Sequence, residues 1–115
     1  MKRFRIWIGI AGAAVALSSC SKSDSATTEP IPPNTIRASL SQVFQPGTLT
    51  VTAGTTVTFE FQALAHNVTF ATVAGAPANI GDTENASVTR VFATAGTYTF
   101  VCTLHPGMAG TVVVN

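Results

Sequence analysis

The sequence contains little charge, few cysteines and a single long apolar run. Charged residues make up 10% of the 115 residues, and six Lys/Arg stand against five Asp/Glu, so the chain lacks the basic surface of a nucleic-acid-binding protein. Two cysteines are too few for a disulfide-dense scaffold. The length fits one domain rather than two, and a hydrophobic fraction of 46% argues against a disordered chain. These absences leave one globular domain with no nucleic-acid partner.

The long apolar run lies near the N-terminus, at residues 6–17, directly after a positively charged head. It is shorter than the roughly 20 apolar residues of a typical transmembrane helix. A charged head, an apolar stretch and small residues together predict a secretory signal. The Leu-Ser-Ser-Cys sequence at residues 17–20 resembles the lipobox of bacterial lipoproteins, which implies cleavage before Cys20 and acylation of its thiol. The alternative is an ordinary secretory signal that is cut nearby.

The lipobox resemblance also implies a location, in the periplasm or at the cell surface, with the protein held on a bacterial membrane by a lipid anchor. Ser21 rather than Asp follows Cys20, which favours the outer membrane where a bacterium has two. Residues 21–34 are rich in Ser, Thr and Pro, and they bury too little to repay the entropy of ordering. We therefore expect a signal peptide at residues 1–19, a lipidated cysteine and flexible tether at 20–34, and a folded domain at 35–115.

The expected domain alternates apolar and polar side chains over short runs that are separated by Gly and Pro turns. Val57, Phe59 and Phe61, for example, share one face of a run whose intervening residues are polar. This period of two predicts strands with one buried face. The expected strands lie near residues 36–40, 48–52, 55–61, 66–71, 86–92, 97–102 and 111–115. About seven short strands at this spacing predict an all-β sandwich or barrel, and the irregular stretch 72–85 is expected to be a loop or a short helical turn.

Four side chains of the expected domain carry metal-binding chemistry, and three of them fall within one short segment. Cys102, His105 and Met108 follow the spacing C-x2-H-x2-M, and His66 lies upstream at the start of a predicted strand. Calcium and magnesium prefer oxygen ligands, and zinc seldom binds methionine. One thiolate, two imidazoles and a weak axial thioether form the ligand pattern of blue copper sites. Each residue alone could be ordinary core, but the complete set predicts a site for one copper ion.

Residues 96–108, with the sequence Gly-Thr-Tyr-Thr-Phe-Val-Cys-Thr-Leu-His-Pro-Gly-Met, resemble the copper loop of the cupredoxins, and more narrowly that of their plastocyanin and amicyanin group. Residues 65–70 resemble the upstream ligand segment of that family, and residues 44–57 resemble its early strands. The resemblance implies a cupredoxin-like Greek-key β-sandwich that binds one type 1 copper ion.

The family pattern also implies a role for each site residue. The strong equatorial ligands are implied to be His66, Cys102 and His105. The axial ligand is implied to be Met108. Asn67 is implied to hydrogen-bond across to the loop that follows Cys102, where Thr103 supplies a hydroxyl. The second histidine ligand is implied to lie near the surface in an apolar patch that includes Pro106, Gly107 and either Phe44 or Pro77.

The function implied by the resemblance is that of an extracytoplasmic blue copper protein. Such a protein carries single electrons between donor and acceptor proteins, as a monomer and without enzymatic activity of its own. Two groups of catalytic relatives do not match, because Val101 and Thr103 stand where trinuclear-cluster oxidases have histidines, and Pro106 stands where a dinuclear site needs a second cysteine. The alternatives are copper storage or delivery and, from a different class, a metal-free sandwich that binds other proteins.

Overall fold

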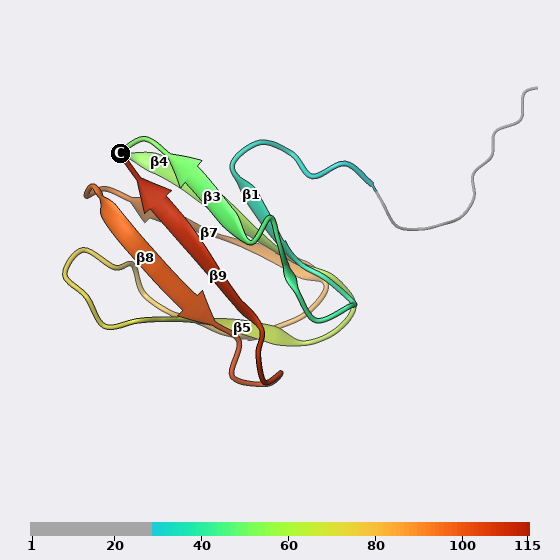
Figure 1. The fold of residues 1–115 in the computed structure, drawn as a ribbon. Coiled ribbons are helices and arrows are strands. Elements are labelled where there is room, and N and C mark those ends of the chain that lie inside the picture. The colour runs from blue at the N-terminus through green and yellow to red at the C-terminus, as the bar shows by residue number, and fades with distance from the viewer. Residues whose placement is uncertain (1–28) are drawn as a thin grey trace, which may run out of the picture.

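The computed structural model describes residues 29–115, in which nine β-strands form two sheets (Figure 1). The strands are β1 (Thr35–Ala38), β2 (Phe44–Gln45), β3 (Thr48–Val51), β4 (Thr55–Phe61), β5 (His66–Phe70), β6 (Ile80–Thr83), β7 (Ala86–Phe92), β8 (Gly96–Val101) and β9 (Ala109–Val114). Within this part of the chain, no helix is long and apolar enough to cross a membrane. The predicted signal peptide, Cys20 and the tether up to residue 28 lie outside the described residues.

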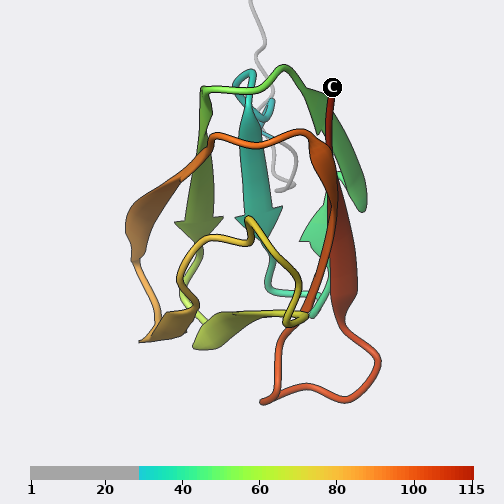
Figure 2. The same cartoon turned by 90° about the vertical axis from the view of Figure 1, so that its left-hand side faces the viewer.

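The two sheets face each other as a sandwich, which is visible in the side view of Figure 2. The first sheet has the strand order β2-β1-β4-β7, and the second has the order β3-β9-β8-β5-β6. β1 runs parallel to β4, and β3 runs parallel to β9, whereas the other pairings are antiparallel. The connection between β8 and β9 projects from the end of the sandwich opposite the C-terminus (Figure 2). The predicted all-β sandwich is confirmed.

Two of these nine strands, β2 and β6, are not predicted by the sequence. β2 has two residues, which is too short for an alternating pattern to be recognised. β6 lies within residues 72–85, where the sequence predicts a loop or a short helical turn; the loop precedes β6, and the strand itself is what the expectation misses. Its pairing with β5 shifts register between His66 and Val68, and this irregularity breaks the alternation that would reveal a strand.

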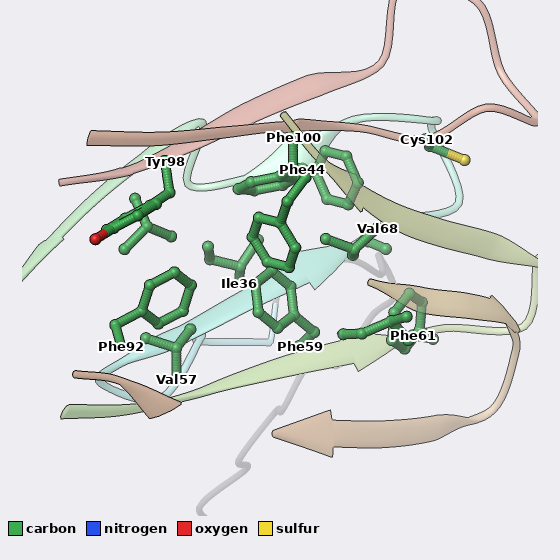
Figure 3. Close-up of a cluster of buried hydrophobic side chains, with 14 of the residues drawn as sticks. Ile36, Phe44, Val57, Phe59, Phe61, Val68, Phe92, Tyr98, Phe100 and Cys102 are labelled. Atoms are coloured by element: carbon green, nitrogen blue, oxygen red, sulfur yellow. The ribbon is translucent and has the colours of Figure 1, made fainter. Parts of the chain in front are cut away.

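The core between the sheets is made largely of aromatic side chains from alternate strand positions (Figure 3). Phe100 lies at its centre, with its ring centroid 4.8 Å from that of Phe44 and 5.6 Å from those of Phe59 and Phe70, each pair meeting edge to face. Such pairs add to the free energy gained by burying the rings. Two residues further on, Cys102 continues the same buried face, so the core sets the position of its sulfur at one end of the cluster (Figure 3).

Arg37 of β1 faces away from this core and is nevertheless buried. Its guanidinium pairs with the carboxylate of Glu60 on β4, its cross-strand neighbour. The same group donates to the main-chain carbonyls of Glu29, at 2.9 Å, and Pro30, at 3.5 Å. The first described residues, which the sequence assigns to the tether, are therefore held against the outer face of the first sheet.

Candidate metal centre

Three of the predicted ligands converge at the end of the sandwich from which the β8–β9 connection projects. His66 begins β5, Cys102 directly follows β8, and His105 lies in the loop that leads to β9. The two histidine Nδ1 atoms are 3.1 Å apart, and the Cys102 Sγ lies 3.9 Å from Nδ1 of His66 and 3.6 Å from Nδ1 of His105. The structure thus brings together two imidazoles and a thiol that are up to 39 residues apart in sequence.

The triangle formed by these three atoms has the size that a bound metal ion requires. With sides of 3.1, 3.6 and 3.9 Å, the point equidistant from its corners lies inside the triangle and about 2.1 Å from each atom, near the metal–imidazole length of about 2.0–2.1 Å and the metal–thiolate length of about 2.3 Å. All three atoms are electron-pair donors when His66 and His105 are neutral and Cys102 is ionised. A cation at this point would satisfy all of them.

The fourth predicted ligand, Met108, lies in the same loop and is buried, with 3% of its surface exposed. The loop is closed by two main-chain hydrogen bonds, from the Cys102 N–H to the Met108 carbonyl at 2.9 Å and from the Met108 N–H to the His105 carbonyl at 3.1 Å. Gly107 allows this tight return because its φ of +84° is strained for other residues. The C-x2-H-x2-M spacing therefore corresponds to one closed turn between paired strands.

His66 is held in the tautomer that metal binding requires. Its Nε2 donates to the main-chain carbonyl of Ser39 at 3.0 Å, which leaves the lone pair of Nδ1 directed at Cys102 and His105. Burial lowers the pKa of the His66 imidazole, the hydrogen bond to Ser39 opposes that change, and the nearby His105 adds to it. The ring is fully buried and favours its neutral form, which is the form that binds metals.

Asn67 connects the sulfur to the neighbouring strands. Its main-chain N–H points at the Cys102 Sγ at 3.4 Å, and its side-chain Nδ2 donates to the Thr103 hydroxyl at 2.7 Å. The Thr103 N–H donates back to the Asn67 Oδ1 at 3.0 Å, so the pairing implied by the family resemblance is present. The Nδ2 also donates to Asp82 Oδ1 on β6 at 3.0 Å. Neither the Asp82 contact nor the Ser39 contact is predicted by the sequence.

The exposed apolar side chains near the site differ in part from the expected patch. His105 is half-buried, whereas His66 and Cys102 are buried. Phe44 is buried against Phe100 and does not reach the surface, and Pro77 lies in the connection whose Gly75 packs against Tyr98 at the other end of β8. The large exposed apolar side chains in the loops that carry His105 and Ser39 are Leu104, Leu40 and Val43.

Comparison with known proteins agrees with this site. The family described as copper binding proteins, plastocyanin/azurin family, matches residues 34–115. A solved structure of a reduced amicyanin mutant is 34% identical, with a TM-score of 0.62, over 70% of this chain and 80% of that one. A mutant plastocyanin of fern is 30% identical, with a TM-score of 0.62, over 70% of this chain and 99% of that one. A comparison with curated protein sequences found no match.

The fold and the site together define a cupredoxin, and the chain belongs to the plastocyanin/azurin family of copper-binding proteins. The sandwich is accordingly cupredoxin-like. Its cofactor is one type 1 copper ion, which the cluster of two imidazoles and a thiol fits in both donor chemistry and size, with the Met108 thioether in the same loop.

Proposed function

We propose that this protein is an extracytoplasmic blue copper protein that carries single electrons between donor and acceptor proteins. We assign the equatorial ligands to His66, Cys102 and His105, and the axial ligand to Met108. The observation that carries the proposal is the triangle of two Nδ1 atoms and one Sγ, with sides of 3.1, 3.6 and 3.9 Å. When bound there, copper supplies a one-electron couple between Cu(I) and Cu(II).

Hydrogen bonds from the surrounding residues hold the proposed ligands in place. Ser39 fixes the His66 ring, and the Met108 carbonyl and the Asn67 N–H fix the two sides of Cys102. Ligands that are held in one arrangement need little rearrangement when an electron arrives or leaves. The solved structures similar to this chain include oxidised and reduced forms of amicyanin, which supports the same role here.

Among the proposed ligands, His105 is the one suited to exchange electrons with another protein. His66 and Cys102 are buried, whereas the His105 ring is half-buried, and Leu104 beside it is exposed. A small apolar face of this kind suits brief docking followed by release. We propose that the donor and acceptor dock there, that the protein is a monomer without catalysis of its own, and that Cys20 anchors it by lipid outside the cytoplasm.

Copper storage or delivery is the alternative function. A delivery protein must release copper to a partner, and that partner would need direct access to the thiolate. Cys102 has only 3% of its surface exposed and His66 has 0%, so this access would require the residues that cover them to move. The burial of these two donors favours electron transfer over delivery.

A visible spectrum of the copper-loaded protein tests the proposal. Residues 21–115 contain all nine described strands and the whole family match, and this fragment would be purified free of zinc and mixed with Cu(II). We expect an intense blue band from thiolate-to-copper charge transfer and a reversible one-electron wave by voltammetry. Cys102→Ala should abolish both, whereas Val101→Ala, a matched change at the exposed neighbour, should keep them.

Two results would overturn the proposal. A colourless wild-type protein would exclude the blue copper site. A blue protein whose copper is lost to a chelator after every reduction would instead indicate copper delivery.

A further inference from the structure

We propose that Asp82 is a positioning residue of the metal centre: its carboxylate fixes the Asn67 side chain and, through Asn67, the hydrogen bond that the Cys102 sulfur receives. The inference rests on the proposed copper function. Asp82 lies on the edge strand β6, in a stretch that the sequence does not predict to be a strand, and it touches none of the proposed ligands by a hydrogen bond within the described residues.

The Asn67 carboxamide uses every hydrogen-bonding position it has. Its Nδ2 donates to Thr103 Oγ1 at 2.7 Å and to Asp82 Oδ1 at 3.0 Å. Its Oδ1 accepts from the Thr103 N–H at 3.0 Å and from the Thr69 hydroxyl at 3.3 Å. A carboxamide has two N–H donors and two acceptor lone pairs, so these four contacts fix its position and orientation.

Asp82 differs from Thr103 and Thr69 in the part of the fold to which it attaches the Asn67 side chain. Thr103 belongs to the loop that carries the proposed ligands, and Thr69 is two residues from Asn67 on the same strand. Asp82 comes from a third strand, so it ties Asn67 to a part of the sheet outside the loop. Its carboxylate only accepts hydrogen bonds, and a charged acceptor binds an N–H about twice as strongly as a neutral one.

A bulge in the pairing of β5 with β6 aims Asp82 at Asn67. His66 is paired with Thr83 and Val68 with Ile80, so Gly81 and Asp82 together stand opposite the single residue Asn67. An extra residue of this kind redirects a side chain, and such bulges are common beside functional sites. Here it brings the carboxylate to the side chain whose main-chain N–H faces the sulfur.

Asp82 has two effects on the copper couple, and they have opposite signs. A negative charge near the site favours Cu(II) and lowers the reduction potential. An N–H directed at the thiolate weakens its donation to the metal, favours Cu(I) and raises the potential. A variant that removes the charge alone therefore differs from one that removes the charge and the positioning together.

The experiment compares Asp82→Asn with Asp82→Ala in the copper-loaded protein by voltammetry and visible spectroscopy. Asparagine keeps an acceptor oxygen without the charge, so the D82N potential should lie above that of wild type, with an unchanged absorption band. The D82A potential should lie below that of D82N, and its thiolate-to-copper band should shift. Glu84→Gln is the matched control, because Glu84 is an exposed carboxylate two residues away. It removes one charge and should leave the band in place.

Hydrogen exchange of the Asn67 amide groups, measured by NMR on the metal-free protein, gives a readout that does not depend on copper. The Asn67 main-chain and side-chain protons should exchange about tenfold faster in D82A than in wild type, as expected for a lost hydrogen bond to a charged group, and D82N, with a neutral acceptor, should lie between the two. If Asp82→Ala does not fold, Asp82→Ser takes its place, because its hydroxyl is too short to reach Asn67.

Equal potentials and bands in D82N and D82A would show that Asp82 acts by charge alone, and this would overturn the proposal. A lower melting temperature in D82A with no change in potential, band or exchange would reduce Asp82 to a structural residue and would overturn it as well. If the wild-type protein binds no copper, the proposed function fails, and the exchange comparison still decides whether Asp82 positions Asn67.

Discussion

Gly110 and Phe100 face each other across β8 and β9, and this contact leaves no room for a larger residue. A Cβ added at Gly110 would lie 2.5 Å from Cζ and 2.7 Å from Cε2 of the Phe100 ring. The ring cannot swing away, because Phe44, Phe59 and Phe70 meet it edge to face at 4.8, 5.6 and 5.6 Å. Overpacking of a tight core costs about 1–3 kcal/mol. We therefore expect Gly110→Ala to lower the free energy of unfolding by about that amount.

The assay is thermal unfolding of the metal-free protein, since a bound metal would add its own stabilisation. For a domain of this size, each kcal/mol shifts the melting temperature by about 4–8 °C, so Gly110→Ala should lower it by roughly 4–24 °C. Gly47→Ala is the matched control, because an added Cβ there meets nothing within 4 Å. It should leave the melting temperature unchanged or slightly higher. Equal melting temperatures for the two variants would refute the argument that Phe100 is confined.

Two further predictions concern a buried hydroxyl and a buried imidazole. Tyr98→Phe removes the hydrogen bond of 2.7 Å from the tyrosine hydroxyl to the Thr94 carbonyl, and urea unfolding should show a loss of about 1 kcal/mol; an unchanged midpoint would mean that water replaces the bond fully. Burial lowers the pKa of His66, so below pH about 6.5 the unfolded chain binds a proton that the folded chain resists. The metal-free protein should therefore lose stability as the pH falls below about 6.5, until the lowered pKa is reached, and His66→Gln should lack this loss. An equally steep decline in that variant would assign the pH dependence to other groups.

The strands that the sequence predicts are at least four residues long, and every second side chain in them faces the core. The alternation of Val57, Phe59 and Phe61 matches β4, and that of Tyr98 and Phe100 matches β8 and leads to Cys102. Since a period of two places every second side chain in the core, the pattern also predicts that the Cys102 thiol lies on the buried face. The metal centre is predictable for a different reason, because few ions accept a thiolate, two imidazoles and a thioether.

The contacts that support the site could not be predicted in the same way. Ser39 holds His66 through its main-chain carbonyl, which every residue has and which therefore leaves no mark on the sequence. Asp82 reaches Asn67 through a bulge on a strand whose alternation is broken by that same bulge. Pro106 and Gly107 are exposed beside His105 as expected, but Phe44 is not part of that surface, because it packs in the core against the Phe100 ring.

Arg37 gives the sandwich a mechanical property. Its guanidinium donates hydrogen bonds to the main-chain carbonyls of Glu29 and Pro30 and forms an ion pair with Glu60 on the adjacent strand. A pulling force on the chain before residue 29 would thus be transmitted through Arg37 to β1 and through Glu60 to β4, in addition to the path along the backbone to Thr35. Because β1 lies inside its sheet between β2 and β4, tension carried to it acts on two strand pairings, whereas an edge strand would have only one.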